Sequence, residues 1–253
     1  MQTANTTAIV TGGASGLGAA TAAALAAAGC RFIALDLAAA CDAGPAVDAV
    51  TYVPTDGTDE AQVRAAVAVA SEDPQSPLRV VVNCAGVGMS ARILGRGGVH
   101  DLALYRKIIE INLIGSFTVL AIAAQAIAAT EPDAQGQRGV VINTASIAAY
   151  DGQVGQAAYS SSKGGIVGLT LPAARDLAQH GIRVMTIAPG IIETPMLATV
   201  SDEFRAGLAA GVPFPQRLGR PEEYAALAMA IIGHDYLNGE VIRMDGALRM
   251  APR

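Results

Sequence analysis

The amino-acid sequence predicts a single α/β domain, residues 1–253, with a doubly wound, mainly parallel sheet of seven strands. Three observations lead to this fold class. Short apolar runs alternate with longer helical patterns, the apolar runs are nearly continuous, and neither a linker nor a low-complexity tract interrupts them. Strands that are apolar on both faces are typical of a parallel sheet covered by helices on both sides. The helical crossovers should be right-handed.

The individual elements follow from the length and periodicity of each stretch. Short apolar runs rich in Val, Ile and Ala predict buried strands. These runs lie at 7–11, 31–36, 50–54, 79–84, 139–145, 182–188 and 240–244. Longer stretches with helical spacing lie at 15–28, 58–71, 101–129, 156–179 and 221–232.

Two segments interrupt this alternation. Residues 87–99 (VGMSARILGRGGV) are rich in glycine and contain two arginines, and residues 190–220 contain large apolar side chains among prolines. Both follow the carboxyl ends of predicted strands, where ligands bind in open α/β sheets. We therefore expect both segments to flank a substrate, with 190–220 as a substrate loop. An ordinary surface connection is the alternative.

Composition limits the class of protein. Apolar residues make up 52% of the chain and charged residues 15%, which is typical of a folded protein with a large core. The net charge of −5 argues against a nucleic-acid partner, since such proteins have a basic surplus. The three cysteines (Cys30, Cys41, Cys84) and three histidines (His100, His180, His234) have neither disulfide nor metal spacing, so we expect no metal site.

The expected location is cytoplasmic. The N-terminal residues MQTANTTAIVTGG lead into a predicted strand and show neither a basic region nor an apolar signal segment. The most apolar stretches, such as 120–129, fall short of the roughly 20 residues that span a bilayer. We therefore expect no membrane association.

A glycine turn between the first strand and the first helix predicts a nucleotide site. Gly12, Gly16 and Gly18 have the spacing G-x-x-x-G-x-G, and Ser15 and Leu17 lie within the same turn. Such a turn lets backbone N–H groups approach a pyrophosphate at the positive end of the helix. Glycine is common in tight loops, so the position of this turn is its main support.

Asp36, at the end of the second predicted strand, predicts the choice of nucleotide. A carboxylate there accepts hydrogen bonds from the adenosine ribose hydroxyls and repels a 2′-phosphate. Residues 37–40 are all apolar, so no cation accompanies it, and NAD is favoured over NADP. A helix N-cap is the alternative for Asp36. Asp56 is expected at the adenine edge, and a turn-forming Asp is its alternative.

The stretch from Ser146 to Lys163 predicts acid–base chemistry. If its second half is helical, Tyr159 and Lys163 lie on one face, roughly 5–6 Å apart at Cβ. A nearby ammonium favours the phenolate and so lowers the pKa of a tyrosine. Such a tyrosine can act as a general acid–base near neutral pH. Ser146, at the end of an apolar run, is placed to hydrogen-bond the same substrate oxygen. The alternative is a surface lysine beside a buried tyrosine.

Together these residues resemble the short-chain dehydrogenase/reductase family, which implies a Rossmann fold. The matching motifs cover the whole chain: TGGASGLG, the turn Asn83-Cys84-Ala85-Gly86, Asn112, Ser146, Tyr159-x-x-x-Lys163, and Pro189-Gly190 with Thr194. Many members have Asn where this chain has Cys84. This departure puts a hydrogen bond that braces the turn in doubt.

Several longer stretches, among them GQVGQAAYSSSKGGIVG and LNGEVIRMDGALRM, resemble one branch, the type-2 3-hydroxyacyl-CoA dehydrogenases, also described as 17β-hydroxysteroid dehydrogenases. The resemblance implies oxidation of the 3-hydroxyl of short or branched acyl-CoA thioesters with NAD. It also implies activity on some steroids and a homotetramer.

The resemblance also implies roles for individual residues. Tyr159 is the general acid–base, Ser146 polarises the reacting oxygen, Lys163 binds the nicotinamide ribose and lowers the Tyr159 pKa, and Asn112 holds a water of a proton relay. Without these partners, Asn112 would be interpreted as a polar residue whose side chain hydrogen-bonds the backbone inside a helix. Gln153 is expected to contact the thioester. Further contacts with NAD are expected from Asn83, Ala85 and Gly86. The nicotinamide amide is expected to be lined by Pro189, Gly190, Ile192 and Thr194.

The sequence leaves functions other than acyl-CoA dehydrogenation open. An NAD-dependent dehydrogenase of steroids or other secondary alcohols is the closest alternative, and Asp36 opposes an NADP-linked ketoreductase. An NAD-binding structural subunit is disfavoured because Asn112, Ser146, Tyr159 and Lys163 are all present. Since CoA is polyanionic and the chain is acidic, a local basic patch is required, and Arg92, Arg96 and Arg205 are the candidates.

Overall fold

The computed structural model describes residues 1–45, 50–197 and 201–252. Its central sheet contains β1 (Thr7–Thr11), β2 (Arg31–Asp36), β3 (Val50–Pro54), β4 (Leu78–Asn83), β7 (Gly139–Thr144), β8 (Ile182–Pro189) and β9 (Val241–Met244). The strand order is β3-β2-β1-β4-β7-β8-β9, and every neighbouring pair is parallel. The order therefore reverses between β1 and β4, which makes this the switch point where ligands bind in such sheets.

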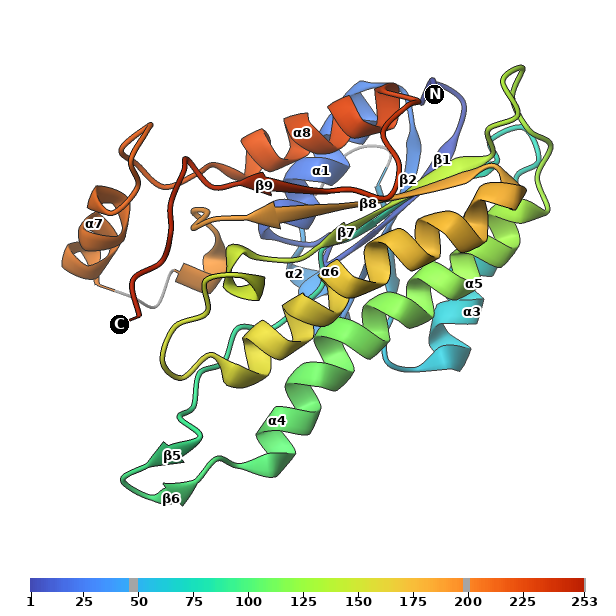
Figure 1. Ribbon diagram of the computed structural model, residues 1–253. Helices are drawn as coiled ribbons and strands as arrows, with labels where there is room; N and C mark the ends of the chain where they lie inside the picture. Colours follow the sequence, from blue (N-terminus) through green and yellow to red (C-terminus); the bar gives the residue numbers. More distant parts are fainter. Residues whose placement is uncertain (46–49, 198–200, 253) are drawn as a thin grey trace.

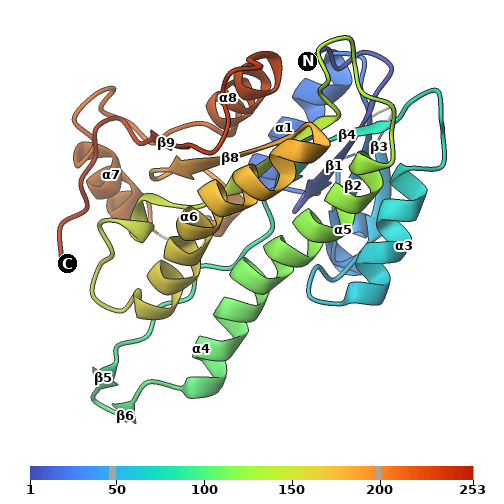
Figure 2. The same cartoon turned by 45° about the vertical axis from the view of Figure 1, so that its right-hand side comes forward.

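Helices cover both faces of the sheet (Figures 1 and 2). The α-helices of the described residues are α1 (Gly16–Ala27), α2 (Ala38–Ala43), α3 (Glu60–Ala70), α4 (Leu102–Ile109), α5 (Ser116–Ala128), α6 (Ala157–Leu177), α7 (Asp202–Ala210) and α8 (Pro221–Gly233). Side chains of α1 and α8 pack on one face, and those of α3, α5 and α6 pack on the other.

The alternation of side chains along β1 shows why the strand is apolar at its three central positions. Ala8 and Val10 point toward the layer formed by α1 and α8, whereas Ile9 points toward α3 and α5. All three are fully buried. Because successive side chains of a strand face opposite sides, a sheet covered on both faces needs apolar residues at every position.

The predicted fold class is confirmed. The strands at 7–11, 31–36 and 50–54 have the predicted bounds, and the other four begin and end within one residue of the prediction. The prediction of one helix over 101–129 was too simple. A π-helical turn, Glu110–Gly115, separates α4 from α5, and Asn112 lies inside it.

Three elements were not predicted. They are α2, α7, and a short antiparallel hairpin formed by β5 (Leu94–Gly95) and β6 (Gly98–Val99). Helix α7 lies within the predicted substrate loop and begins with a hydrogen bond from the Phe204 N–H to the Ser201 hydroxyl at 3.2 Å. Residues 198–200 of that loop lie outside the described part of the chain.

One helical rod among the described residues is long and apolar enough to cross a membrane by length and composition. It runs over Leu102–Ala128, 27 residues, and its most apolar window has a mean hydropathy of 1.8. This is longer than the apolar stretches recognised in the sequence. It is weak evidence for a membrane span, because the core helix of a soluble protein passes the same test. Here Val119, Ala123 and Ile127 pack into the core beneath the sheet.

Candidate active site

The predicted site residues lie along the carboxyl edge of the sheet. The glycine turn follows β1, Asp36 ends β2, the turn at 83–86 follows β4, Ser146 follows β7, and Pro189 ends β8. Parallel strands bring these five ends to one edge although they are up to 178 residues apart in the chain, from Thr11 to Pro189. The fold thus gathers most of the predicted residues at the switch point.

The geometry of the glycine turn fits a bound pyrophosphate. Gly12 has φ +65°, which favours glycine, and a Cβ on Gly18 would lie 2.1 Å from the Gly12 carbonyl oxygen. Only a residue without a side chain permits this close approach of turn and helix. The Ser15 hydroxyl makes no capping hydrogen bond to α1, so the N-terminal end of the helix stays available to an anion.

The carboxylate of Asp36 is held in place by backbone donors. The Ala14 N–H donates to Oδ2 at 3.1 Å, and the Leu37 N–H donates to Oδ1 at 2.9 Å. The N-cap of α2 is Leu37, so the alternative reading of Asp36 as an N-cap is wrong. Each oxygen has two lone pairs, so both can still accept a ribose hydroxyl.

Asp56 has the local geometry of its alternative reading. Its Oδ1 accepts from the Thr58 N–H at 2.9 Å and from the Thr58 hydroxyl at 2.8 Å, and the residue is exposed. These are the contacts of a turn-forming Asp. The contact with adenine stays a prediction.

Thr11 braces the turn at 83–86, a role that sequence reasoning missed. Its hydroxyl oxygen accepts from the N–H groups of Cys84 and Ala85, each at 3.1 Å. Asn83 donates through Nδ2 to Asn143 Oδ1 at 2.9 Å on the neighbouring strand. The turn is therefore braced without an Asn at position 84. The only sequence signal was the polar Thr11 at the end of an apolar strand.

The side chain of Asn112 is buried and fully engaged with the protein. Its Oδ1 accepts from the Val87 N–H at 2.8 Å, and Nδ2 donates to the Val87 carbonyl and to the Ser162 hydroxyl, each at 3.0 Å. The side chain thus bonds backbone, as in its alternative reading. It ties the segment after β4 to α6 at the residue before Lys163. The water-holding role stays a prediction. Asn112 lies in the π-helical turn Glu110–Gly115, and turns of this kind are frequently found at functional sites.

Ser146, Tyr159 and Lys163 come together between β7 and the first turns of α6. The Lys163 Nζ donates to the Thr144 carbonyl at 2.8 Å and lies 5.9 Å from the centre of the Tyr159 ring. Ser146 caps a short turn by accepting from the Ala148 N–H at 3.1 Å. A Cβ on Gly86 would lie 3.5 Å from Nζ, so this glycine gives access to the lysine.

Burial dominates the proton affinities of this group. Desolvation raises the pKa of Tyr159, and the nearby Ser146 hydroxyl offsets only part of the rise. Desolvation also lowers the pKa of Lys163 from 10.5 to about 8, with the nearby Cys84 acting in the opposite direction. The predicted lowering of the Tyr159 pKa is therefore wrong for the protein alone. The reason is that the cost of burying a phenolate exceeds the attraction of the lysine.

The segment after β8 returns to the glycine turn. The Gly190 N–H donates to the Met244 carbonyl at 2.9 Å, and Ile192 forms an isolated bridge with Gly219. A Cβ on Gly16 would lie 3.5 Å from the side chain of Thr194. Thr194 therefore lies beside the glycine turn, and its expected contact with the nicotinamide amide stays a prediction.

A hollow of about 460 Å³ lies beside the first turn of α6. Gln153 is part of its wall, as predicted for a substrate residue, although its Nε2 also donates to the Ala251 carbonyl at 2.9 Å. The buried Ser160 hydroxyl has no hydrogen-bond partner among the described residues, and sequence reasoning missed it. The lining residues are Arg92, Ile93, Leu94, Gly152, Gln153, Val154, Gly155, Ala157 and Ser160.

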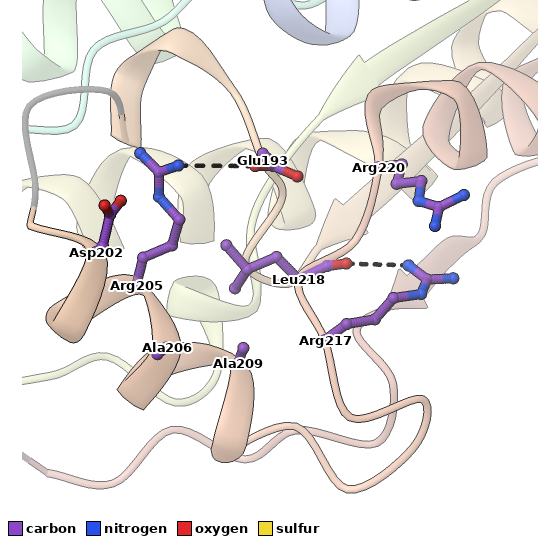
Figure 3. Close-up of a pocket in the computed structure, with 8 residues that line it drawn as sticks. All are labelled: Glu193, Asp202, Arg205, Ala206, Ala209, Arg217, Leu218 and Arg220. Carbon is purple, nitrogen blue, oxygen red and sulfur yellow. Dashed lines mark hydrogen bonds and ion pairs between the residues drawn. The ribbon is translucent and has the colours of Figure 1, made fainter.

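The three predicted arginines do not form one basic patch. Arg92 and Arg96 belong to the segment that contains the hairpin β5–β6, whereas Arg205 lies on α7. The hairpin and α7 lie apart from one another in both views (Figures 1 and 2). Arg205 lies in a separate hollow of about 390 Å³ and pairs with Glu193 at 3.8 Å (Figure 3). The fold separates them because α7 and the hairpin follow different strands.

No group of three or more His, Cys, Asp or Glu residues in the described ranges is arranged to hold a metal ion.

Comparison with known proteins gives a consistent result. The family model described as short chain dehydrogenase matches residues 6–204. The Bos taurus protein named 3-hydroxyacyl-CoA dehydrogenase type-2 is 52% identical over 250 residues, 97% of this chain and 95% of that protein. The Homo sapiens protein of the same name is 50% identical with the same coverage.

A solved structure agrees with these relatives. The crystal structure of 3-hydroxyacyl-CoA dehydrogenase type-2 from Mycobacterium avium superposes with a TM-score of 0.91 and 43% identity, covering 98% of each chain. The match extends over the sheet, the glycine turn and the Ser146–Lys163 region alike. The chain belongs to the short-chain dehydrogenase family.

Proposed function

We propose that this protein is an NAD-dependent 3-hydroxyacyl-CoA dehydrogenase that acts on short or branched acyl-CoA thioesters. The observations that support it most are the grouping of Tyr159 and Lys163 near Ser146, and a hollow beside the first turn of α6 that has Arg92 and Gln153 in its wall. Relatives named for this activity are about half identical over nearly the whole chain. Together they favour a secondary alcohol attached to an anionic carrier.

Tyr159 is the proton donor and acceptor in this proposal. Because burial raises its pKa, it is protonated near neutral pH and ready to protonate a keto oxygen. The Ser146 hydroxyl lies close enough to affect that pKa and can share the same substrate oxygen. Lys163, with a pKa of about 8, is largely charged at neutral pH and stabilises negative charge that develops on the phenol.

The cofactor of this proposal is NAD, which supplies the hydride acceptor at nicotinamide C4 when it is bound. Asp36 would accept from the adenosine ribose, and Ser15 with the N-terminal end of α1 would hold the pyrophosphate. Gly86 would leave room beside Lys163 for the nicotinamide ribose, and Thr194 would contact the amide end.

The substrate would enter the hollow beside the first turn of α6, the helix that carries Tyr159. Arg92 and the exposed hairpin residue Arg96 would attract the phosphates of CoA, and Gln153 would approach the thioester. Ile93, Leu94 and Val154 give the same hollow an apolar wall. That wall also suits a steroid or another apolar secondary alcohol, which is the second candidate substrate class.

The proposed assembly is a homotetramer. Ile114, Phe117 and Leu171 are 42%, 50% and 44% exposed on the outer side of the α4–α5 rod and α6. Apolar side chains of this size gathered on neighbouring helices favour contact with a second copy. Light scattering on the purified protein tests this, and a monomer at micromolar concentration would rule it out.

Turnover on a substrate panel tests the proposed function. Acetoacetyl-CoA, longer and branched 3-keto and 3-hydroxyacyl-CoA thioesters, and a set of hydroxysteroids would be assayed with NAD or NADH. The expected result is a kcat/KM for acyl-CoA at least ~10-fold above that for steroids. Such a ratio corresponds to about 1.4 kcal/mol of discrimination between the two substrate classes. Equal or better activity on steroids would favour the second candidate. Tyr159→Phe is the control for background oxidation.

A further inference from the structure

Arg243, near the end of β9, contacts the loop that joins the two catalytic segments. We call residues 150–155, between Ser146 and Tyr159, the connecting loop. The Arg243 Nη2 donates to Asp151 Oδ2 at 2.6 Å, and the guanidinium lies 5.1 Å from the centre of the Tyr150 ring. Both partners belong to the connecting loop, although they are more than 90 residues away in the chain.

The same guanidinium is held from its other side by the C-terminal tail, residues 245–252. Its Nε donates to Asp245 Oδ2 at 2.8 Å, and Nη2 also donates to the Leu248 carbonyl at 3.2 Å. The side chains of Arg243 and Asp151 are 22% and 21% exposed. A pair that is mostly withdrawn from water and linked to several acceptors holds its geometry better than an exposed pair does.

The tail also bonds the connecting loop directly. Gln153 Nε2 donates to the Ala251 carbonyl at 2.9 Å, and the Val154 N–H donates to the Pro252 carbonyl at 3.0 Å. Leu248 of the tail packs with Ile147 in a small buried cluster. Ile147 is the residue after Ser146. The tail therefore contacts the segment that follows Ser146 as well as the connecting loop.

The connecting loop forms one wall of the hollow beside the first turn of α6. Gly152, Gln153, Val154 and Gly155 all line it, facing the hairpin segment that contains Arg92. A Cβ on Gly152 would lie 2.4 Å from the Ser160 hydroxyl, so the loop packs tightly on the first turn of α6. A shift of the loop would therefore move the wall of the hollow relative to Tyr159.

We propose that Arg243 is a positioning residue that fixes the substrate wall through Asp151. The ion pair and the tail contacts together hold the connecting loop against the first turn of α6, in the position that an occupant of the hollow requires. The inference rests on the proposed function only in taking this hollow as the substrate site. Arg243 itself contacts neither the catalytic residues nor the glycine turn in the contacts described.

The test compares Asp151→Asn, Arg243→Met and the double variant with the matched control Arg249→Met. Arg249 also bonds Asp245 Oδ2, at 3.1 Å, but it is 61% exposed and does not contact the connecting loop. Asp151→Asn preserves shape and leaves Arg243 paired with Asp245, so it should fold even if Arg243→Met does not. Melting curves establish which variants are folded.

The first readout is amide hydrogen exchange in a peptide covering 150–157, which needs no substrate. Asp151→Asn and Arg243→Met should raise exchange there at least ~10-fold while exchange in the sheet strands stays unchanged, because local opening is governed by local contacts. Arg249→Met should leave it unchanged. Unchanged exchange in both loop variants would overturn the fastening role, whatever the substrate proves to be.

The second readout is steady-state kinetics with the best substrate that the wild type turns over. The KM for that substrate should rise ~10–100-fold with the affinity for NADH nearly unchanged, since a misplacement of about 1 Å can cost about 100-fold. The double variant should be no worse than Arg243→Met, because both changes break one link. Additive losses, or equal loss of NADH binding, would indicate a general structural role instead. If acyl-CoA is not a substrate but a steroid is, the proposed function fails and this comparison still applies.

Discussion

The Lys163 ammonium lies 5.9 Å from the centre of the Tyr159 ring, and both groups are withdrawn from water. Burial favours the neutral form of both groups, so it raises the pKa of the phenol and lowers the pKa of the amine. The phenol is therefore protonated near neutral pH, and the lysine keeps its charge only because its pKa of about 8 is still above neutrality. The pair is set for proton transfer at a cost to the folded state.

Tyr159→Phe should lower turnover by at least ~10²-fold, a typical general acid–base contribution. The ring keeps its packing and only the hydroxyl is lost, so the affinity for NAD, measured by fluorescence titration, should be nearly unchanged. Lys163→Ala should reduce both turnover and cofactor affinity. Near-normal turnover in Tyr159→Phe would show that another group transfers the proton.

Lys163→Met should abolish most activity and stabilise the fold. The shift of the Lys163 pKa from 10.5 to about 8 is a penalty on the order of 3 kcal/mol below pH 8, at about 1.36 kcal/mol per unit. Loss of its hydrogen bond to the Thr144 carbonyl offsets about 1 kcal/mol of this gain. The free energy of unfolding near neutral pH, from urea titrations, should therefore rise by about 2 kcal/mol.

The pH dependence of stability provides a second check on Lys163. Its folded-state pKa lies below the unfolded one, so between about pH 8 and 10.5 the unfolded chain binds more protons. Relative to Lys163→Met, the wild type should therefore gain stability as pH rises through this window. The three cysteines, whose pKa values are raised by burial, act in the opposite direction in both proteins, so the comparison of the two curves is the measurement. Parallel stability curves up to about pH 9.5, below the tyrosine range, would mean that Lys163 is not strained in the folded protein.

Much of the fold was predictable because strands buried on both faces of a sheet have runs of consecutive apolar residues. Strands 7–11 and 31–36 are apolar at all their inner positions, with polar residues only at their ends, and this is what a covered parallel sheet requires. The π-helical turn at Glu110–Gly115 was not predictable, since the apolar periodicity continues through it. Its cause is tertiary, because Asn112 bonds Val87 and Ser162 across the site.

The site was predictable where chemistry depends on local spacing, as in the glycine turn and the Tyr159–Lys163 pair. It was not predictable where partners lie far apart in the chain. The bonds of Thr11 to the turn at 83–86 and of Gln153 to Ala251 depend on how strands and tail meet. The pKa of Tyr159 was misjudged for a related reason: the sequence shows the neighbouring lysine but not the depth of burial.

Neutralising the hairpin arginines should weaken binding of CoA substrates in particular. Arg92→Gln with Arg96→Gln should raise the KM for acyl-CoA ~10-fold and leave that for a CoA-free alcohol nearly unchanged, because only CoA is polyanionic. The effect should diminish with added salt. Arg205→Gln is the matched control, since this residue lies on α7 and pairs with Glu193. Equal effects on both substrates, or a larger effect of Arg205→Gln, would remove the hairpin from CoA binding.

Cofactor preference should depend on Asp36, whose two oxygens are fixed by the N–H groups of Ala14 and Leu37. In NAD the 2′-hydroxyl can donate to this carboxylate, a charge-assisted bond worth roughly 1.5–3 kcal/mol. In NADP a 2′-phosphate would face the carboxylate, and residues 37–40 offer no cation to compensate. The wild type should therefore favour NAD by about 10²–10⁴-fold in kcat/KM, at ~1.4 kcal/mol per factor of ten.

Two variants separate the lost bond from the repulsion. Asp36→Ala should reduce the preference mainly by weakening NAD, and adding Leu37→Arg should move it toward NADP by supplying a cation for the phosphate. Both variants remove the acceptor of the Ala14 N–H, so the melting temperature must be followed as a control. The deciding measurement is kcat/KM with each cofactor on the wild type and both variants. A wild type that used NADP as well as NAD would exclude Asp36 as the discriminating residue, and it would remove the main reason for preferring an NAD-linked dehydrogenase to an NADP-linked ketoreductase.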